Sequence, residues 1–71
     1  MRSEQITARA LKATGDDRYK LAVLVSKRSE QISVGAKPLV ENTQGLKPVD
    51  IALLEISEGK ISLENIEEKN S

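Results

Sequence analysis

The sequence lacks several residue types: among its 71 residues there is no cysteine, histidine, tryptophan or phenylalanine. Without cysteine or histidine, neither a disulfide nor an ordinary zinc site can stabilise the fold. The same absences exclude acid–base catalysis by histidine and nucleophilic catalysis by cysteine. An enzyme is therefore the least favoured class of protein, and the sequence predicts no cofactor and no metal ion.

Aromatic side chains are almost absent as well, since Tyr19 is the only one. Aromatic residues usually supply much of the apolar area in cores and interfaces. The length allows a single domain, and a chain of this size buries only roughly 60% of its unfolded surface. This composition favours a protein whose core is completed by a partner.

The chain has no net charge, because its eleven basic and eleven acidic residues cancel. A DNA-binding domain of this size is usually basic, since most of its affinity comes from neutralising phosphates. No apolar run approaches the roughly 18 residues of a membrane span, and the opening Met1–Gln5 leads into no secretory apolar region. We expect a soluble cytoplasmic protein without a membrane partner.

The strongest helix signal runs over residues 18–34, which contain no glycine or proline. Asp16 or Asp17 is suited to cap its start, and Gly35 is suited to end it. One helical face carries Leu21, Leu24, Val25, Arg28 and Ile32. The apolar run 21–25 covers more than one face; alone it could be a buried strand, but the length of the segment favours helix. Such a helix is expected to pack on two sides, one of which can be another protein.

Two further helices are expected. A short one covers residues 3–13, and another begins at Pro48, a residue suited to the first helical position, and closes at Gly59. The apolar stripe of the later helix comprises Val49, Ala52, Leu53 and Ile56, widened by Ile51 and Leu54. Ser62 then reads as the cap of one more short turn from Leu63.

The predicted fold is therefore all-α, a small compact bundle of three to four helices with an ordered loop between the second and the third. That loop, residues 35–47, contains two apolar side chains in Pro38-Leu39-Val40, which must pack somewhere, so we expect the loop to be ordered. Residues 1–66 are assigned to one helical domain and residues 67–71 to a polar disordered tail.

Carboxylates and glycines offer few candidates for chemistry. Asp16 and Asp17 could bind a cation, but helix capping is the favoured interpretation because no further acidic residue follows at ligand spacing. Glu55 and Glu58 lie three apart on a helix and are predicted to be solvated surface. The isolated glycines Gly35, Gly45 and Gly59 lack the spacing of a phosphate-binding loop and are interpreted as turns and helix stops.

Basic residues cluster only around Lys27-Arg28, with Arg18 and Lys20 upstream on other faces of the helix. They could contact nucleic acid, form salt bridges with a protein partner, or be solvated surface. Arg28 differs because it falls on the apolar stripe, where an arginine usually pairs with a carboxylate or a carbonyl. Tyr19 could stack on a nucleobase, but packing in the core near the helix start is favoured.

Three ordered stretches carry a family resemblance. Gly15-Asp-Asp-Arg-Tyr-Lys-Leu-Ala-Val-Leu-Val-Ser-Lys-Arg-Ser-Glu-Gln-Ile32 is followed by Gly35-Ala-Lys-Pro-Leu-Val40 and then by Lys47-Pro-Val-Asp-Ile-Ala-Leu-Leu-Glu-Ile-Ser-Glu-Gly-Lys-Ile61. With a looser match at Ile6–Leu11, this arrangement resembles the omega subunit of bacterial DNA-directed RNA polymerase. The resemblance covers roughly residues 6–61.

The resemblance implies a compact helical, non-catalytic subunit of a nucleotidyltransferase complex. Such subunits hold the C-terminal region of the largest subunit, β′, and promote its folding and its assembly into the core enzyme. No direct sequence-specific binding of nucleic acid is expected. By matching positions, the interface with the partner is placed on Arg18, Tyr19, Leu21, Leu24, Val25, Lys27, Arg28, Gln31, Pro38, Leu39, Val40, Ile51, Ala52, Glu55 and Ile56.

The chain departs from the family at Ser26 and Ser29, where alanine is frequent, and in its first four residues. In some members N-terminal residues help the largest subunit to bind the alarmone (p)ppGpp; here only Arg2 could take that part. The alternative to an assembly subunit is a small helical DNA-binding or antitoxin-like module that uses Ser26–Gln31 as its recognition surface.

Overall fold

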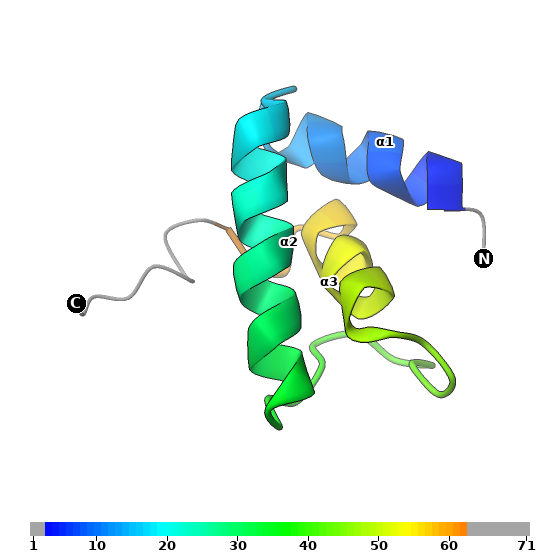
Figure 1. Cartoon of the computed structure of the whole chain (residues 1–71). Coiled ribbons are helices and arrows are strands. Elements are labelled where there is room, and N and C mark those ends of the chain that lie inside the picture. The colour runs from blue at the N-terminus through cyan, green and yellow to red at the C-terminus, as the bar shows by residue number, and fades with distance from the viewer. Residues whose placement is uncertain (1–2, 63–71) are drawn as a thin grey trace.

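Three helices make up the fold. The computed structural model describes residues 3–62, which contain α1 (Ser3–Ala13), α2 (Arg18–Ser33) and α3 (Pro48–Ser57). Figure 1 shows α1 crossing near the start of α2, and the loop after α2 returning the chain to the start of α3. This architecture confirms the predicted all-α bundle. The predicted turn from Leu63 and the polar tail lie outside the described residues, as does Arg2.

The start of α2 is fixed by a side-chain cap. Asp17 adopts an extended backbone conformation, and its Oδ1 accepts hydrogen bonds from the backbone N–H groups of Tyr19 (3.0 Å) and Lys20 (3.1 Å). These bonds satisfy two of the amides that a helix start leaves without an intrahelical partner. Of the two predicted capping residues, Asp17 is therefore the one that performs the role.

The ends of α2 and α3 share one geometry. Gly35 follows α2 with a φ of +114°, and Gly59 follows α3 with a φ of +71°, both in the region that glycine adopts without a steric penalty. In each case the next residue folds back on the helix: the Ala36 amide donates to the Gln31 carbonyl at 3.0 Å, and the Lys60 amide donates to the Glu55 carbonyl at 2.8 Å. Both predicted helix stops are confirmed.

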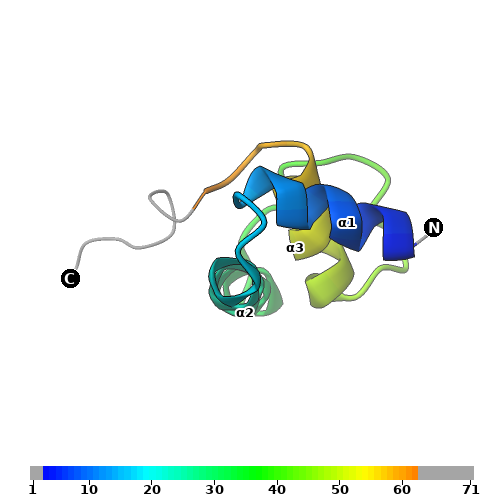
Figure 2. The ribbon, with the colours of Figure 1, turned by 90° about the horizontal axis from the view of Figure 1, so that it is seen from above.

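The apolar core is small and lies where the three helices meet. Ala10, Leu24, Ile56 and Ile61 form one buried cluster, with Leu21, Val25 and Leu53 packed partly against it. In the view from above, α1 and α3 lie together beside α2, and α1 packs mainly against α3 (Figure 2). Ile61 reaches this cluster from beyond α3, so the chain after the last helix also closes the core.

Two predicted core positions are wrong. Tyr19 is 78% exposed, because it occupies the first turn of α2 on the side away from the bundle. Val49 is 47% exposed, because the buried face of α3 is centred on Ile51, Ala52, Glu55 and Ile56 rather than on the stripe that starts at Val49.

The loop between α2 and α3 is anchored by hydrogen bonds rather than by apolar packing. Leu39 remains 49% exposed and Val40 is half-buried, so the chain itself covers this apolar pair only in part. Instead, the Leu39 amide donates to a Glu55 carboxylate oxygen at 2.8 Å. The loop is thus ordered, as predicted, but through its backbone.

Candidate functional site

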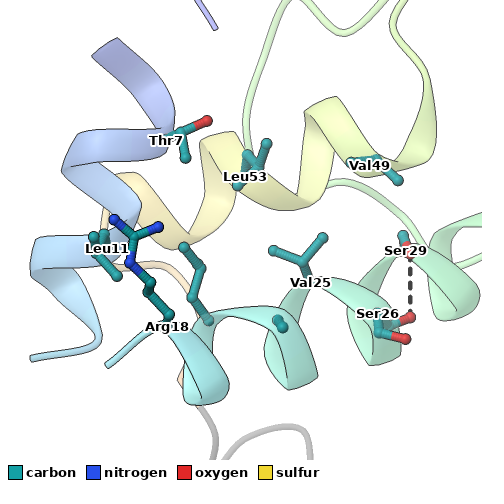
Figure 3. A pocket seen from close by; sticks show the side chains of 10 residues that line it. Thr7, Leu11, Arg18, Val25, Ser26, Ser29, Val49 and Leu53 are labelled. Carbon is teal, nitrogen blue, oxygen red and sulfur yellow. Dashed lines mark hydrogen bonds between the residues drawn. The ribbon is translucent and has the colours of Figure 1, made fainter. Parts of the chain in front are cut away.

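An open groove of about 550 Å³ lies between the three helices. Aliphatic side chains from every helix line it: Leu11 of α1; Leu21, Ala22 and Val25 of α2; Val49 and Leu53 of α3. Thr7, Arg18, Ser26 and Ser29 complete the lining. Figure 3 shows Val25 of α2 and Leu53 of α3 facing one another across the groove, with Arg18 beside Leu11.

The groove arises from a second stripe on each helix. Thr7 and Leu11 are four residues apart on α1, Val49 and Leu53 on α3, and residues 21, 25 and 29 repeat the spacing on α2. Residues four apart share a helical face. While the core takes one face of each helix, these pairs form a neighbouring face that no other described part of the chain covers.

Chemically, the groove is suited to apolar contact. Its lining contains no carboxylate or other general base that could activate its hydroxyl groups, and Arg18 is its only charged member. Aliphatic side chains of this kind are typical of the buried centre of a protein interface. The groove is therefore a candidate interface rather than a candidate catalytic centre.

A polar cluster, here called the Arg28 network, lies beside the core. The Arg28 guanidinium pairs with the Glu55 carboxylate through two hydrogen bonds, Nε to Oε1 at 2.5 Å and Nη2 to Oε2 at 3.0 Å. Its Nη2 also donates to the Lys37 carbonyl at 3.1 Å, and its Nη1 donates to Gln31 Oε1 at 3.0 Å. With the Leu39 amide on Glu55, the network joins α2, the loop and α3.

The Arg28 network is buried, and its polar groups are paired. The Glu55 side chain is fully buried and that of Arg28 is 10% exposed. A buried ion pair is tolerated when bidentate geometry and further hydrogen bonds satisfy its remaining atoms. Among residues 3–62, no buried side-chain nitrogen or oxygen lacks a partner. The Arg28 network is thus complete within the chain.

These contacts test the predictions made for Arg28 and for Glu55. The prediction that Arg28 pairs with a carboxylate or a carbonyl is confirmed, and it does both. The prediction that Glu55 is solvated surface is wrong, because the side chain turns inward to neutralise Arg28; Glu58, three residues later, is exposed.

The predicted interface residues fall into several environments. Arg18, Leu21 and Val25 line the groove. Leu24, Ile51, Ala52 and Ile56 are buried. Arg28, Gln31, Leu39 and Glu55 belong to the Arg28 network. Tyr19, Lys27 and Pro38 are exposed, and Val40 is half-buried. The structure thus separates candidate contacts from residues that build the fold.

Sequence reasoning missed most of the groove, including Thr7, Leu11 and Ala22. Val49 and Leu53 were noticed only as members of the apolar stripe of α3. The available signal was the apolar run 21–25, which spans more helical faces than one core can cover. What it could not indicate was which residues of α1 and α3 stand opposite.

Residues 3–62 contain neither a membrane-spanning helix nor a group of three or more potential metal ligands. No helix in this range has both the length and the apolar character needed to cross a membrane. In the same range, no three acidic, cysteine or histidine side chains gather as they would around a metal ion.

Comparison with known proteins places the chain in a family. The RNA polymerase Rpb6 family matches residues 9–63. The chain is 61% identical over 69 residues to the DNA-directed RNA polymerase subunit omega of Campylobacter concisus, and 58% identical over 69 residues to that of Campylobacter curvus. Each alignment covers 96% of this chain and 97% of the relative.

A more distant relative shows the same relationship. The subunit omega of Helicobacter pylori is 50% identical over 70 residues, which cover 97% of this chain and 95% of the relative. No solved structure matches. The range matched by the family contains all three sequence stretches, which lie between residues 15 and 61. The chain therefore belongs to the RNA polymerase Rpb6 family, among the omega subunits of bacterial DNA-directed RNA polymerase.

Proposed function

We propose that this chain is a non-catalytic subunit that binds the largest subunit, β′, of RNA polymerase and promotes its folding and its assembly into the core enzyme. The observation that carries the proposal is the apolar groove that the three helices leave open in a chain whose relatives are omega subunits. The largest subunit would place apolar side chains in this groove.

Simple linkage explains how such binding would assist assembly. A subunit that binds only the folded form of its partner stabilises that form by mass action. Because the Arg28 network and the apolar core already order this chain, the groove is preformed, and little of the binding free energy would be lost to ordering it. A small subunit can therefore shift the folding equilibrium of a much larger one.

The residues of the chain support a role without catalysis. Histidine and cysteine are absent from the sequence, and the fully buried carboxylate of Glu55 is engaged by Arg28 and by the Leu39 amide. We place the protein in the cytoplasm, where its relatives' enzyme transcribes DNA.

Co-expression with the β′ subunit of the same organism tests the proposal. A stoichiometric complex on size exclusion is expected. The proposal is wrong if the chain elutes free while the polymerase assembles without it.

A groove variant makes the test sharper. Ala22 lines the groove but is exposed, so Ala22→Glu introduces a charge there without disturbing the core. We expect the affinity for core enzyme lacking this chain to fall at least about tenfold, because a carboxylate would be desolvated among apolar groups.

Ala8→Glu is the matched control, since Ala8 is an exposed position of α1 that does not line the groove. Equal binding by the two variants would exclude the groove as the interface. Leu24 is unsuitable for this purpose because it is 2% exposed and part of the core.

The alternative DNA-binding module gains no support from the structure. Its predicted recognition surface, Ser26–Gln31, has Arg28 at its centre, and that guanidinium is buried against Glu55. Only Lys27 of the basic pair is exposed. A DNA-binding chain would show an affinity for duplex DNA that falls steeply with salt, whereas we expect no appreciable binding by the isolated chain.

A further inference from the structure

The side of α2 opposite to the groove carries two lysines around a valine. Lys27 is two residues from Val25 and from Ser29, both of which line the groove, so it lies about 200° around the helix from them. Lys20, seven residues before Lys27, shares its side of the helix, and Val23 lies between the two lysines. These three residues, Lys20, Val23 and Lys27, are here called the lysine face.

The charges of the lysine face are not neutralised by residues 3–62. Lys20 and Lys27 are exposed, and neither ammonium group has a salt-bridge partner in this range. Val23 is half-buried but is not among the apolar side chains packed against the core cluster. Helix α2 contains four basic residues and a single acidic one, Glu30. A segment that fits this face therefore combines apolar side chains with carboxylates.

The described chain ends beside this face. Ile61 belongs to the same buried cluster as Leu24 of α2. Leu24 is in turn three residues from Lys27 and four from Lys20, so it borders the lysine face. In Figures 1 and 2 the end of the described chain, drawn in orange, passes α2 and reaches its side away from α1 and α3. The residues that follow Ser62 thus start within reach of the lysine face.

The next residues of the sequence have the composition that this face requires. Residues 63–68 read Leu-Glu-Asn-Ile-Glu-Glu, two apolar side chains among three carboxylates. Six extended residues span at most about 21 Å, whereas Lys20 and Lys27 are about 10 Å apart along the helix axis. Lysine stems pack against apolar groups while their ammonium groups pair with carboxylates. Charge, reach and apolar content therefore indicate the same occupant.

We propose that the segment 63–68 binds the lysine face of its own chain, with Leu63 and Ile66 on Val23 and the glutamates beside the two ammonium groups. This contact fastens the end of the chain to α2 and holds Ile61 in the core. It replaces the assignment of Lys27 to the polymerase interface, which rested on matching positions alone. Because the lysine face lies opposite to the groove, the proposal does not depend on the proposed function.

Disulfide formation tests the contact in the isolated full chain, which has no native cysteine. Cysteine is a small apolar residue, and a disulfide requires two Cα atoms within about 7 Å, so Val23→Cys with Ile66→Cys reports the proposed packing. Ala22→Cys with Ile66→Cys is the matched control, since Ala22 is the neighbouring residue of α2 but lines the groove. In a glutathione redox buffer, with free thiols counted by mass spectrometry, we expect the first pair to oxidise at least about tenfold faster.

Charge reversal separates binding from mere proximity. Lys20→Glu with Lys27→Glu, added to the Val23 cysteine pair, should slow its oxidation at least about fivefold, because the glutamates of the segment would then be repelled. Arg9→Glu with Lys12→Glu is the control, since it makes the same change in net charge at exposed positions of α1. Far-UV circular dichroism checks that all variants keep the same helicity.

A compensating change completes the test. Glu64→Lys with Glu67→Lys, added to the reversed lysine face, should restore fast oxidation because opposite charges meet again. The proposal is overturned if the Val23 pair oxidises no faster than the Ala22 pair. It is also overturned if reversing the lysine face slows oxidation no more than reversing the charges on α1 does. Either result would leave the lysine face to another molecule, and neither would affect the proposed function, because no measurement involves core enzyme.

Discussion

The groove and the Arg28 network differ in both polarity and burial. The groove is apolar, open and lined from all three helices, and no described part of the chain covers it. The Arg28 network is polar and buried, and every donor or acceptor in it that solvent cannot reach has a partner in the chain. The comparison teaches that different residues can determine the affinity for a partner and the shape of the chain. Under the proposed function, the apolar groove supplies the binding energy. The fully hydrogen-bonded polar groups of the Arg28 network fix the arrangement of the helices.

The largest effect on stability should come from breaking the network. Glu55→Ala leaves the Arg28 guanidinium buried without its carboxylate, and such a loss costs about 3–5 kcal/mol. Urea unfolding followed by far-UV circular dichroism would measure it. Glu58→Ala is the control, because Glu58 is exposed on the turn that follows the same helix. If both variants unfold at the same urea concentration, the network is not decisive for the fold.

A smaller effect is expected in the core. Ile61→Ala removes a side chain that is 9% exposed and closes the cluster from beyond α3, at a cost of about 2 kcal/mol. Thermal unfolding would compare it with Val34→Ala, since Val34 is 80% exposed. A larger loss for Ile61→Ala than for Glu55→Ala would reverse the ranking of apolar and polar contributions proposed above.

Removing the side-chain cap of α2 should lower the free energy of unfolding by less than either of these two changes. Asp17→Ala abolishes the two hydrogen bonds to the Tyr19 and Lys20 amides and should cost about 1 kcal/mol. Asp17→Ser is the control, because serine also caps helix starts. Chemical unfolding measures both variants. If Asp17→Ala and Asp17→Ser unfold at the same denaturant concentration, the side-chain cap does not stabilise α2.

The smallest effect on stability belongs to the groove. Ala22→Glu should change the free energy of unfolding by no more than about 0.5 kcal/mol, because the position is exposed and contributes nothing to the buried cluster. Chemical unfolding of the isolated chain measures this value. A loss approaching that of Glu55→Ala would show that the groove is part of the fold, and the division between the two regions would not hold.

Local signals in the sequence predicted the helices well. Capping by Asp17, the start at Pro48 and the stops at Gly35 and Gly59 depend on residues within one turn of the feature they control. The pairing of Arg28 was also predicted, because an arginine on an apolar stripe must be neutralised. Its partner was not, since Glu55 is 27 residues away and only the packing of α2 on α3 brings the two together.

The candidate site was predicted only in part for the same reason. Leu21 and Val25 were placed at the interface by the family resemblance, but the side chains opposite them in the groove come from other helices. Tyr19 was assigned to the core because aromatic residues are usually buried, whereas its position before the first packed turn leaves it outside. Sequence patterns identify which faces are apolar; the angle between helices decides which of those faces are covered.

The preference of α1 for α3 has a consequence for synthesis of the chain. α1 packs mainly on α3, which leaves the ribosome later, and Ala10 belongs to the same buried cluster as Ile61. Until α3 and Ile61 have emerged, α1 has only a minor contact with α2, and the buried cluster lacks half of its members. We therefore expect the chain to fold late in its synthesis and in one concerted step. The contacts that complete the core join segments about 50 residues apart in the sequence. Folding is consequently slower than in a helical bundle whose helices pack on their neighbours in sequence.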